Sequence, residues 1–496
     1  IGYAPQTLKV TDNNINNIQL SADAELLEEV VVTALGIKRK STALGYNLTE
    51  VKSDEITTVK DANFVNSLTG KVAGLQINSS SSGIGGSTKV VMRGVKSISK
   101  SNNVLYVVDG VPLNNTNGGD VEKNQGFYTA APKGEGIADF NPEDIESMSV
   151  LTGPAAAALY GSNAANGAIL ITTKKGAAGK PKITLSHNTD FSNPFVTPRF
   201  QNTYGNKPGE FSSWGDKLAT PSSYDPLNFF RTGYNTTTAL SISLGNEKNQ
   251  TFASASSTTA EGIIPNNEYQ RYNFTVRNTS NFLNDRMTLD LGFSYVIQKD
   301  QNMLSQGQYF NPIVPLYLFP RGEDFTPYRM YERYDEGRQL MTQHWPYGEM
   351  GMAMQNPYWI INRNMFNNDR DRYMANAGLK YKVFDWMDIS GRVRIDNANT
   401  RHTKKLYAST DAKYAQSKGY YGDRKDVDKQ LYADFLVNIN KRFNDFDLTA
   451  NVGASIQDVS MDYVGAEGQL SMIPNFFTLH NVDLGANNSR SKHDGW

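Results

Sequence analysis

Residues 134–176, GEGIADFNPEDIESMSVLTGPAAAALYGSNAANGAILITTKKG, decide the fold of this chain. Alternating apolar residues predict a strand over 145–151, and a second buried strand is expected over 169–173. Between them a Gly-Pro pair at 153–154 breaks the first strand, and residues 155–160 are predicted to form a short helix. Strand, helix and strand in so short a span indicate a compact α+β module rather than a linker.

Two further glycine-ended strands precede this module. VVMRG spans 90–94 and VLYVVDGVPL spans 104–113, so the motifs RG, VDG, IES, GPAA, YG and NGAI follow one another in this order. This set resembles the plug domain of TonB-dependent outer-membrane transporters, and it is most similar to that of the SusC/RagA-like family. The resemblance is carried by residues 28–176.

Composition argues against several classes of function. The 496 residues carry 49 Lys+Arg against 50 Asp+Glu, so no basic surface for nucleic acid is expected. There is no cysteine, and the five histidines include no pair with metal-ligand spacing, so we expect no disulfide, metal or cofactor. No P-loop, HExxH or GxSxG motif and no coherent Ser/His/Asp group occurs, and we therefore do not expect an enzyme.

The second half has the pattern of long strands with one apolar face. Apolar residues occupy the odd positions from Met287 to Ile297, with Asp290 and Ser294 among the residues between them. Such segments run to about 10–12 residues, the length of a tilted membrane-spanning strand. A mean hydropathy of −0.50 suits a soluble protein, but a membrane β-barrel conceals its apolar face in alternate residues. About nine strands are predicted in this way, near 183–191, 238–244, 251–258, 271–282, 287–297, 372–383, 387–396, 430–442 and 446–457.

The connections between these strands alternate between tight and long. Tight turns are expected at 245–249, 284–285, 384–386 and 444–445, and long loops at 192–237, 298–371 and 397–429. This asymmetry favours a transmembrane antiparallel β-barrel over a large soluble β-sandwich with one wet face. A barrel that encloses a plug has about 22 strands. We therefore expect about 9–10 of them here, and the others after Trp496 or on another chain.

Four regions are predicted along the chain. Residues 1–23 are similar to the end of a carboxypeptidase-regulatory-like β-sandwich, and we expect that residues before Ile1 have been lost. Residues 24–40 hold a TonB box and a linker, residues 41–178 form the plug, and residues 179–496 form the first part of the barrel.

The TonB box is assigned to EEVVVTA at 28–34. Three β-branched valines after two acids make an extended segment whose backbone is suited to β-strand addition. The resemblance implies that TonB grasps this segment in the periplasm, and the alternative is an edge strand of a neighbouring module. The residues assigned to the box are Glu29, Val30, Val31, Val32, Thr33 and Ala34.

Three charged residues of the plug are candidates for a lock that holds it in the barrel: Arg93, Asp109 and Glu146. Arg93 is expected to pair with a carboxylate of the plug or barrel, to be released when the box is pulled. The alternative is a static, buried ion pair that only fixes the fold. The glycines of the plug are expected to serve tight turns and close packing against the barrel wall, at 94, 110, 153, 161 and 167.

Ligand contact is expected in the aromatic-rich loop 298–371, where rings can stack on sugar faces or on peptide side chains. The alternative is a membrane-interface girdle together with packing of the loop on itself. NPYWIINRN at 356–364 is expected to pack structure rather than to bind ligand. The candidate contact residues are Tyr309, Phe310, Tyr328, Tyr331 and Trp345.

The resemblance implies TonB-dependent import of a nutrient oligomer, an oligosaccharide or an oligopeptide, across the bacterial outer membrane. Its implied partners are TonB, a SusD-like surface lipoprotein that caps the barrel, and outer-membrane lipid. A dimer of transporter–lid pairs is compatible with it. Two alternatives stay open: a signal-transducing receptor of the same architecture, and a soluble glycan-binding β-sandwich protein.

Overall fold

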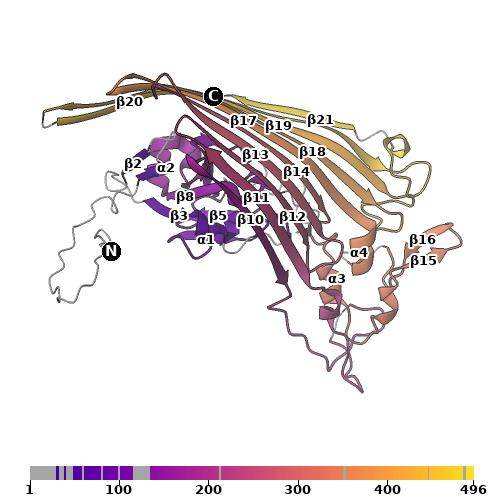
Figure 1. Cartoon of the computed structure of the whole chain (residues 1–496). Coiled ribbons are helices and arrows are strands. Elements are labelled where there is room, and N and C mark those ends of the chain that lie inside the picture. The colour runs from indigo at the N-terminus through magenta and orange to yellow at the C-terminus, as the bar shows by residue number, and fades with distance from the viewer. Residues whose placement is uncertain are drawn as a thin grey trace, which may run out of the picture.

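The structure of the chain is a computed structural model. It describes residues 30–32, 38–40, 48–57, 61–79, 82–98, 101–115, 134–211, 214–305, 307–349, 354–444, 446–483 and 487–495. A large curved sheet runs through the second half, and the N-terminal module lies against its concave side (Figure 1). The fold is mainly β, as predicted.

Each strand of the large sheet pairs antiparallel with the next one along the chain. This follows from the tight turns between alternate strands, which leave neighbours in sequence as neighbours in space. The ten strands are β10 (Gly179–Ser192), β11 (Gly233–Gly245), β12 (Asn249–Glu261), β13 (Glu268–Phe282), β14 (Met287–Gln301), β17 (Asn364–Phe384), β18 (Met387–Leu406), β19 (Tyr420–Phe443), β20 (Phe446–Gln469) and β21 (Asn487–Gly495).

The convex face of the sheet is an apolar band. Register places Val276, Phe293, Ala375, Ile395 and Leu431 side by side across five strands. Four of these side chains are large, and each is between 45% and 51% exposed. Their sequence neighbours point to the concave face, because side chains alternate along a strand. The predicted alternation is therefore confirmed, with the polar face turned toward the plug.

The strands differ in length from those predicted. β17 to β20 span 20 to 24 residues, whereas the apolar alternation marked only 372–383, 387–396, 430–442 and 446–457. The pairing continues past the apolar band into polar residues such as those of 422–429, where Val427 is the one apolar side chain. β21, with the sequence NNSRSKHDG, was not predicted for the same reason.

The plug is a small α+β domain around a five-stranded sheet of order β3-β8-β9-β6-β7. The predicted strands and helix are confirmed as β8, β9 and α2. Phe64, Val65, Ile137 and Met148 lie in its core. Its elements are β3 (Leu48–Lys52), α1 (Ser53–Thr57), β4 (Leu75–Asn78), β5 (Lys89–Met92), β6 (Leu105–Val108), β7 (Val111–Pro112), β8 (Ile145–Leu151), α2 (Gly153–Tyr160) and β9 (Ala168–Thr173).

One expectation for the plug glycines is wrong. Gly167 has φ +106°, and a side chain there would meet Met92 Sδ at 2.6 Å and the carbonyl oxygen of Leu151 at 3.1 Å. At Gly153 the nearest atom would be the carbonyl oxygen of Ala165, at 2.6 Å. Both glycines therefore allow close packing inside the plug, not against the barrel wall.

The long loop between β14 and β17 carries its own secondary structure at the end of the sheet opposite the tight turns (Figure 1). Its elements are α3 (Ile313–Leu318), β15 (Glu332–Asp335), β16 (Leu340–Gln343) and α4 (Pro357–Arg363). Asn356 begins α4 by accepting a hydrogen bond from Tyr358 N at 2.9 Å. Trp359, which is fully buried, donates to Thr410 Oγ1 at 3.0 Å and so ties α4 to the loop after β18.

Candidate functional site at the plug–sheet interface

The turn between β6 and β7 is the part of the plug that reaches one group of wall residues. Asp109 and Gly110 both have positive φ, 50° and 82°, which lets the chain reverse within two residues. Glycine adopts this conformation without strain, whereas aspartate needs local support. That support comes from β9, because Thr173 donates to the Asp109 carboxylate through its backbone N–H at 3.0 Å and its hydroxyl at 2.7 Å.

Wall strand β13 binds this turn through Arg277. Arg277 Nη1 lies 3.0 Å from Asp109 Oδ2, and its Nε and Nη2 each donate to Asp290 on β14 at 2.9 Å. Lys175, which follows β9, also contacts Asp290 Oδ2 at 2.8 Å. Cations and carboxylates of plug and wall thus alternate in one network.

Wall strand β18 holds the backbone of the same turn. Arg392 donates to the carbonyl oxygens of Asp109 and Gly110 and pairs with Asp434. Arg394 donates to the carbonyl oxygen of Val108 at 3.0 Å. We call Arg277, Arg392 and Arg394, with the turn 108–110 that they bind, the turn clamp.

A second group of arginines binds the plug segment 136–139. Asp139 is fully buried, and its Oδ2 lies 3.1 Å from Arg370 and 2.7 Å from Arg372, both on β17. Arg372 also bonds to Asp396 on β18 through two nitrogens, at 2.8 and 2.6 Å. The third arginine of this interface is Arg271 of β13, and we call these three arginines with segment 136–139 the loop clamp.

The loop clamp likewise reaches main-chain oxygens. Arg271 donates to the carbonyl oxygen of Ala62 at 2.9 Å and to that of Ala138. Arg372 donates to the carbonyl oxygen of Gly136 at 2.6 Å. Buried charges of this kind are tolerated when they are paired and hydrogen-bonded. Arg370 and Arg372 pair with Asp139 and Arg271 is held by hydrogen bonds, although Asp139 Oδ1 and the Nε atoms of Arg271 and Arg370 have no hydrogen-bond partner within the described residues. The two clamps therefore fix the plug to the concave face of the sheet.

Two carboxyl groups are buried on the plug side of this interface. Glu135 accepts hydrogen bonds from Thr88 N at 2.8 Å and from Asn63 and Asn115, yet burial raises the pKa of its carboxyl. Burial likewise raises the pKa of Asp144 to about 6, against hydrogen bonds from Ser254 of β12 and Thr275 of β13 that lower it. Desolvation is the larger cause in both residues, because it penalises the charged form.

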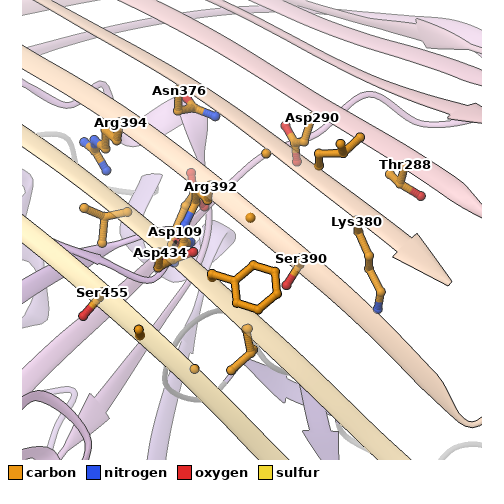
Figure 2. A pocket seen from close by; sticks show the side chains of 18 of the residues that line it. Asp109, Thr288, Asp290, Asn376, Lys380, Ser390, Arg392, Arg394, Asp434 and Ser455 are labelled. Carbon is orange, nitrogen blue, oxygen red and sulfur yellow. Dashed lines mark hydrogen bonds and ion pairs between the residues drawn. The ribbon is translucent and has the colours of Figure 1, made fainter. Parts of the chain in front are cut away.

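A cavity of about 520 Å³ lies between the turn clamp and the wall. Figure 2 shows Asp109, Arg392 and Asp434 close together in it, with Thr288 and Lys380 farther along the strands. Thr288 is the second residue of β14, next to a tight turn, so the cavity extends toward the tight-turn end of the sheet.

Of the three predicted lock residues, the structure brings only Asp109 to the wall. The side chains of Arg93 and Glu146 are exposed, and neither is among the bonding partners of Asp109 described above. For the TonB box, Val30–Val32 forms β1, paired antiparallel with β2 (Lys38–Lys40). Glu29, Thr33 and Ala34 lie outside the described residues. These assignments stay predictions.

The aromatic residues proposed for ligand contact lie within packed clusters of the outer loops. Tyr309 and Phe310 pack with Leu406, and Trp345 packs with Phe319, against which Tyr328 is also placed. Tyr331 is half-buried, with the Arg363 guanidinium 5.6 Å from its ring centre. This packing favours the alternative of loop self-packing for these residues, and a ligand role for them stays a prediction.

The wall arginines are the functional residues that sequence reasoning missed. Their positions on the polar face of β13, β17 and β18 follow from alternation along each strand. No local sequence pattern predicts which wall side chain contacts a backbone carbonyl oxygen far away in the chain. A signal was available in the arginines at 370, 372, 392 and 394, which repeat at the spacing of one face.

No group of three or more His, Cys, Asp or Glu side chains is placed to hold a metal ion within the ranges given above. Within the same ranges, none of the helices combines the length and apolar character needed to cross a membrane.

Comparison with known proteins agrees with this architecture. The TonB-dependent receptor plug domain family matches residues 41–168. TonB-dependent receptor SusC of Bacteroides thetaiotaomicron is 27% identical over 469 residues, which is 90% of this chain and 44% of that protein. TonB-dependent receptor P3 of Formosa agariphila is 26% identical over 507 residues, covering 98% of this chain and 45% of that one.

Among solved structures, the RagAB peptide importer in its open-open state superposes with a TM-score of 0.68 at 20% identity, covering 94% of this chain and 53% of the other. The chain thus spans about half the length of the curated relatives it matches over most of its residues. A plug bound to the polar face of an antiparallel sheet with an apolar outer band defines a TonB-dependent receptor. Within that class the chain is similar to the SusC/RagA-like group, whose members are β-barrel proteins of the outer membrane.

Proposed function

We propose that this chain belongs to an active importer that carries a nutrient oligomer across the outer membrane with energy delivered by TonB. The observation that carries the proposal is the pair of clamps. A plug held by buried arginines closes the lumen at rest, and its hydrogen-bonded contacts can be broken by a directed force. The RagAB relative is a peptide importer by name, which supports transport but leaves open an oligosaccharide or an oligopeptide as the cargo here.

The segment that receives the force is proposed to be Glu29 to Ala34. Its central residues 30–32 are extended, and their backbone pairs with 38–40 in a small hairpin. Exchange of that partner for a strand of TonB would keep the same kind of backbone hydrogen bond while linking the plug to the inner membrane. A SusD-like surface lipoprotein is the proposed partner at the opposite, long-loop end.

The test uses the full-length protein in its own outer membrane. Deletion of 29–34 should abolish uptake of the oligomer that co-purifies with the receptor, while its binding to detergent-solubilised receptor stays unchanged. Val31→Pro removes a backbone N–H and should reproduce the loss, whereas Val31→Thr keeps the extended backbone and should not. Undiminished uptake by the deletion variant would end the assignment of the box.

A further inference from the structure

Many of the wall residues that line the 520 Å³ cavity are small or polar, and the clamp arginines and the apolar Leu436 line it as well. Thr288, Asn376, Gly378, Ser390 and Ser455 line it from four different strands. At the level of the loop clamp, in contrast, the arginines on the same face of the wall contact the plug directly. The interface is therefore packed at one level of the sheet and hollow at the next.

Local packing does not require a glycine at position 378, which lines the cavity. It lies in the middle of β17, and a Cβ added there would find only Asp290 atoms, at 3.9 Å, which is ordinary contact. A Cβ thus fits at 378 without displacing a neighbour. A side chain there would project into the cavity, because Asn376 and Lys380, two positions away on the same face of β17, also line it. The glycine keeps space open that the fold does not require.

The plug side of the cavity is the turn clamp itself. Asp109 and Val111, on either side of the reversal, line it together with the clamp arginines. These contacts are hydrogen bonds and ion pairs with few apolar partners. Movement of this one turn would enlarge the cavity toward the lumen and would draw Val108 from the plug core, whereas the residues of the loop clamp lie elsewhere in the sequence.

We infer that the cavity is the exit compartment for the cargo, a passage between plug and wall with the 108–111 turn as its gate. This inference rests on the proposed import function. The lining suits an extended segment of an oligomer with both polar and apolar groups, because hydroxyls, amides and paired charges of both signs line it beside apolar side chains such as Val111 and Leu436. Its volume lies within the range of about 300–1,000 Å³ typical of sites for small-molecule ligands, which suits a segment and not a folded domain.

The orientation of the sheet agrees with an exit. In outer-membrane barrels the short turns face the periplasm and the long loops face outward. The cavity reaches Thr288 and Lys380, near the tight turns that follow Phe282 and Phe384. Cargo that entered it from the lumen would leave on the periplasmic side.

The test places a removable obstruction in the cavity of the full-length receptor, in its own outer membrane. These 496 residues contain no cysteine, so Gly378→Cys introduces a defined thiol, with the unsubstituted receptor as the labelling background. A mixed fluorescent oligopeptide library and a fluorescent maltooligosaccharide series serve as cargo probes. A bulky methanethiosulfonate attached to the introduced thiol should reduce uptake to the background of cells lacking the receptor, a methyl-sized one should not, and a reductant should restore uptake.

A pair of tryptophan substitutions gives an independent arm. Gly378→Trp should block uptake, whereas Val393→Trp, which places the same ring on the lipid face of the neighbouring strand, should not. Full uptake with the bulky group attached, as verified by mass, would overturn the exit assignment, and so would failure of a reagent supplied from the periplasm to reach the introduced thiol. If the unmodified receptor imports neither probe, it is the import function that fails.

Discussion

Arg277 of wall strand β13 and Asp109 of the plug are joined by an ion pair of 3.0 Å, although 168 positions separate them in the sequence. The pair holds a turn whose backbone is itself in a sparsely populated conformation, with Asp109 at φ 50°. The wall thus supports a strained reversal of the plug at the point where the two domains meet.

The loop clamp should be the costliest contact to break. Arg372→Met removes the guanidinium that pairs with the buried carboxylates of Asp139 and Asp396. Loss of one partner of a buried ion pair costs about 3–5 kcal/mol. We expect faster hydrogen–deuterium exchange over 134–140 in the detergent-solubilised receptor. Arg401→Met is the matched control, because Arg401 pairs with Asp423 while 57% exposed, and such a pair contributes about 0–1 kcal/mol. Equal exchange in the two variants would contradict the clamp.

The stability of the plug should depend on the protonation of Asp144. Its pKa is raised to about 6 in the folded protein, so the folded state binds the proton more tightly than the unfolded chain does. The contribution of Asp144 to the free energy of unfolding is therefore largest below about pH 4. It falls by at most roughly 3 kcal/mol as the pH rises to about 6, and it is level above that pH.

Asp144→Asn should remove this part of the pH dependence, as measured by urea denaturation of the plug between those pH values. Asp54→Asn, at an exposed position of α1, is the control and should retain the slope. A slope that survives in Asp144→Asn would assign the effect to other groups, of which Glu135 is the first to examine.

The outer loop should depend on Asn356. Its amide nitrogen donates to the carbonyl oxygens of Tyr328 and His344 at 2.7 and 3.0 Å, and its oxygen caps α4. Asn356→Ala should destabilise the loop by roughly 2–3 kcal/mol through loss of the cap and two buried bonds. Hydrogen exchange over 328–345 measures this, and the exposed Asn228→Ala should leave it unchanged.

The apolar band should tolerate no charge at its centre. Phe293→Arg should lower the amount of receptor inserted in the outer membrane, because arginine near the bilayer midplane costs about 2–4 kcal/mol. Leu227→Arg, at an exposed loop position, is the control and should insert normally. Quantification in purified outer membranes distinguishes the two, and normal insertion of Phe293→Arg would place the band outside the lipid.

Sequence reasoning located the elements that rest on local chemistry. The Gly-Pro break after Leu151 and the alternation of 145–151 define β8 and α2, because turn residues and period-two patterns act over a few positions. It underestimated β19, whose first residues pair with β18 and β20 without an apolar face to reveal them. Alternation is enough to put Arg392 on the polar face of β18 but not to put it against Asp109, because alternation sets the face to which a side chain points and says nothing of what lies opposite.

Six bonds of the two clamps end on main-chain oxygens, at positions 62, 108, 109, 110, 136 and 138. Replacing the side chains at those positions leaves the acceptors intact as long as the chain keeps its course. Provided that Asp109 and Asp139 are kept, the sequence of the inner domain is thus free to drift, or to be grafted from a homologous receptor, while the arginines of the enclosing strands still recognise the course of its backbone.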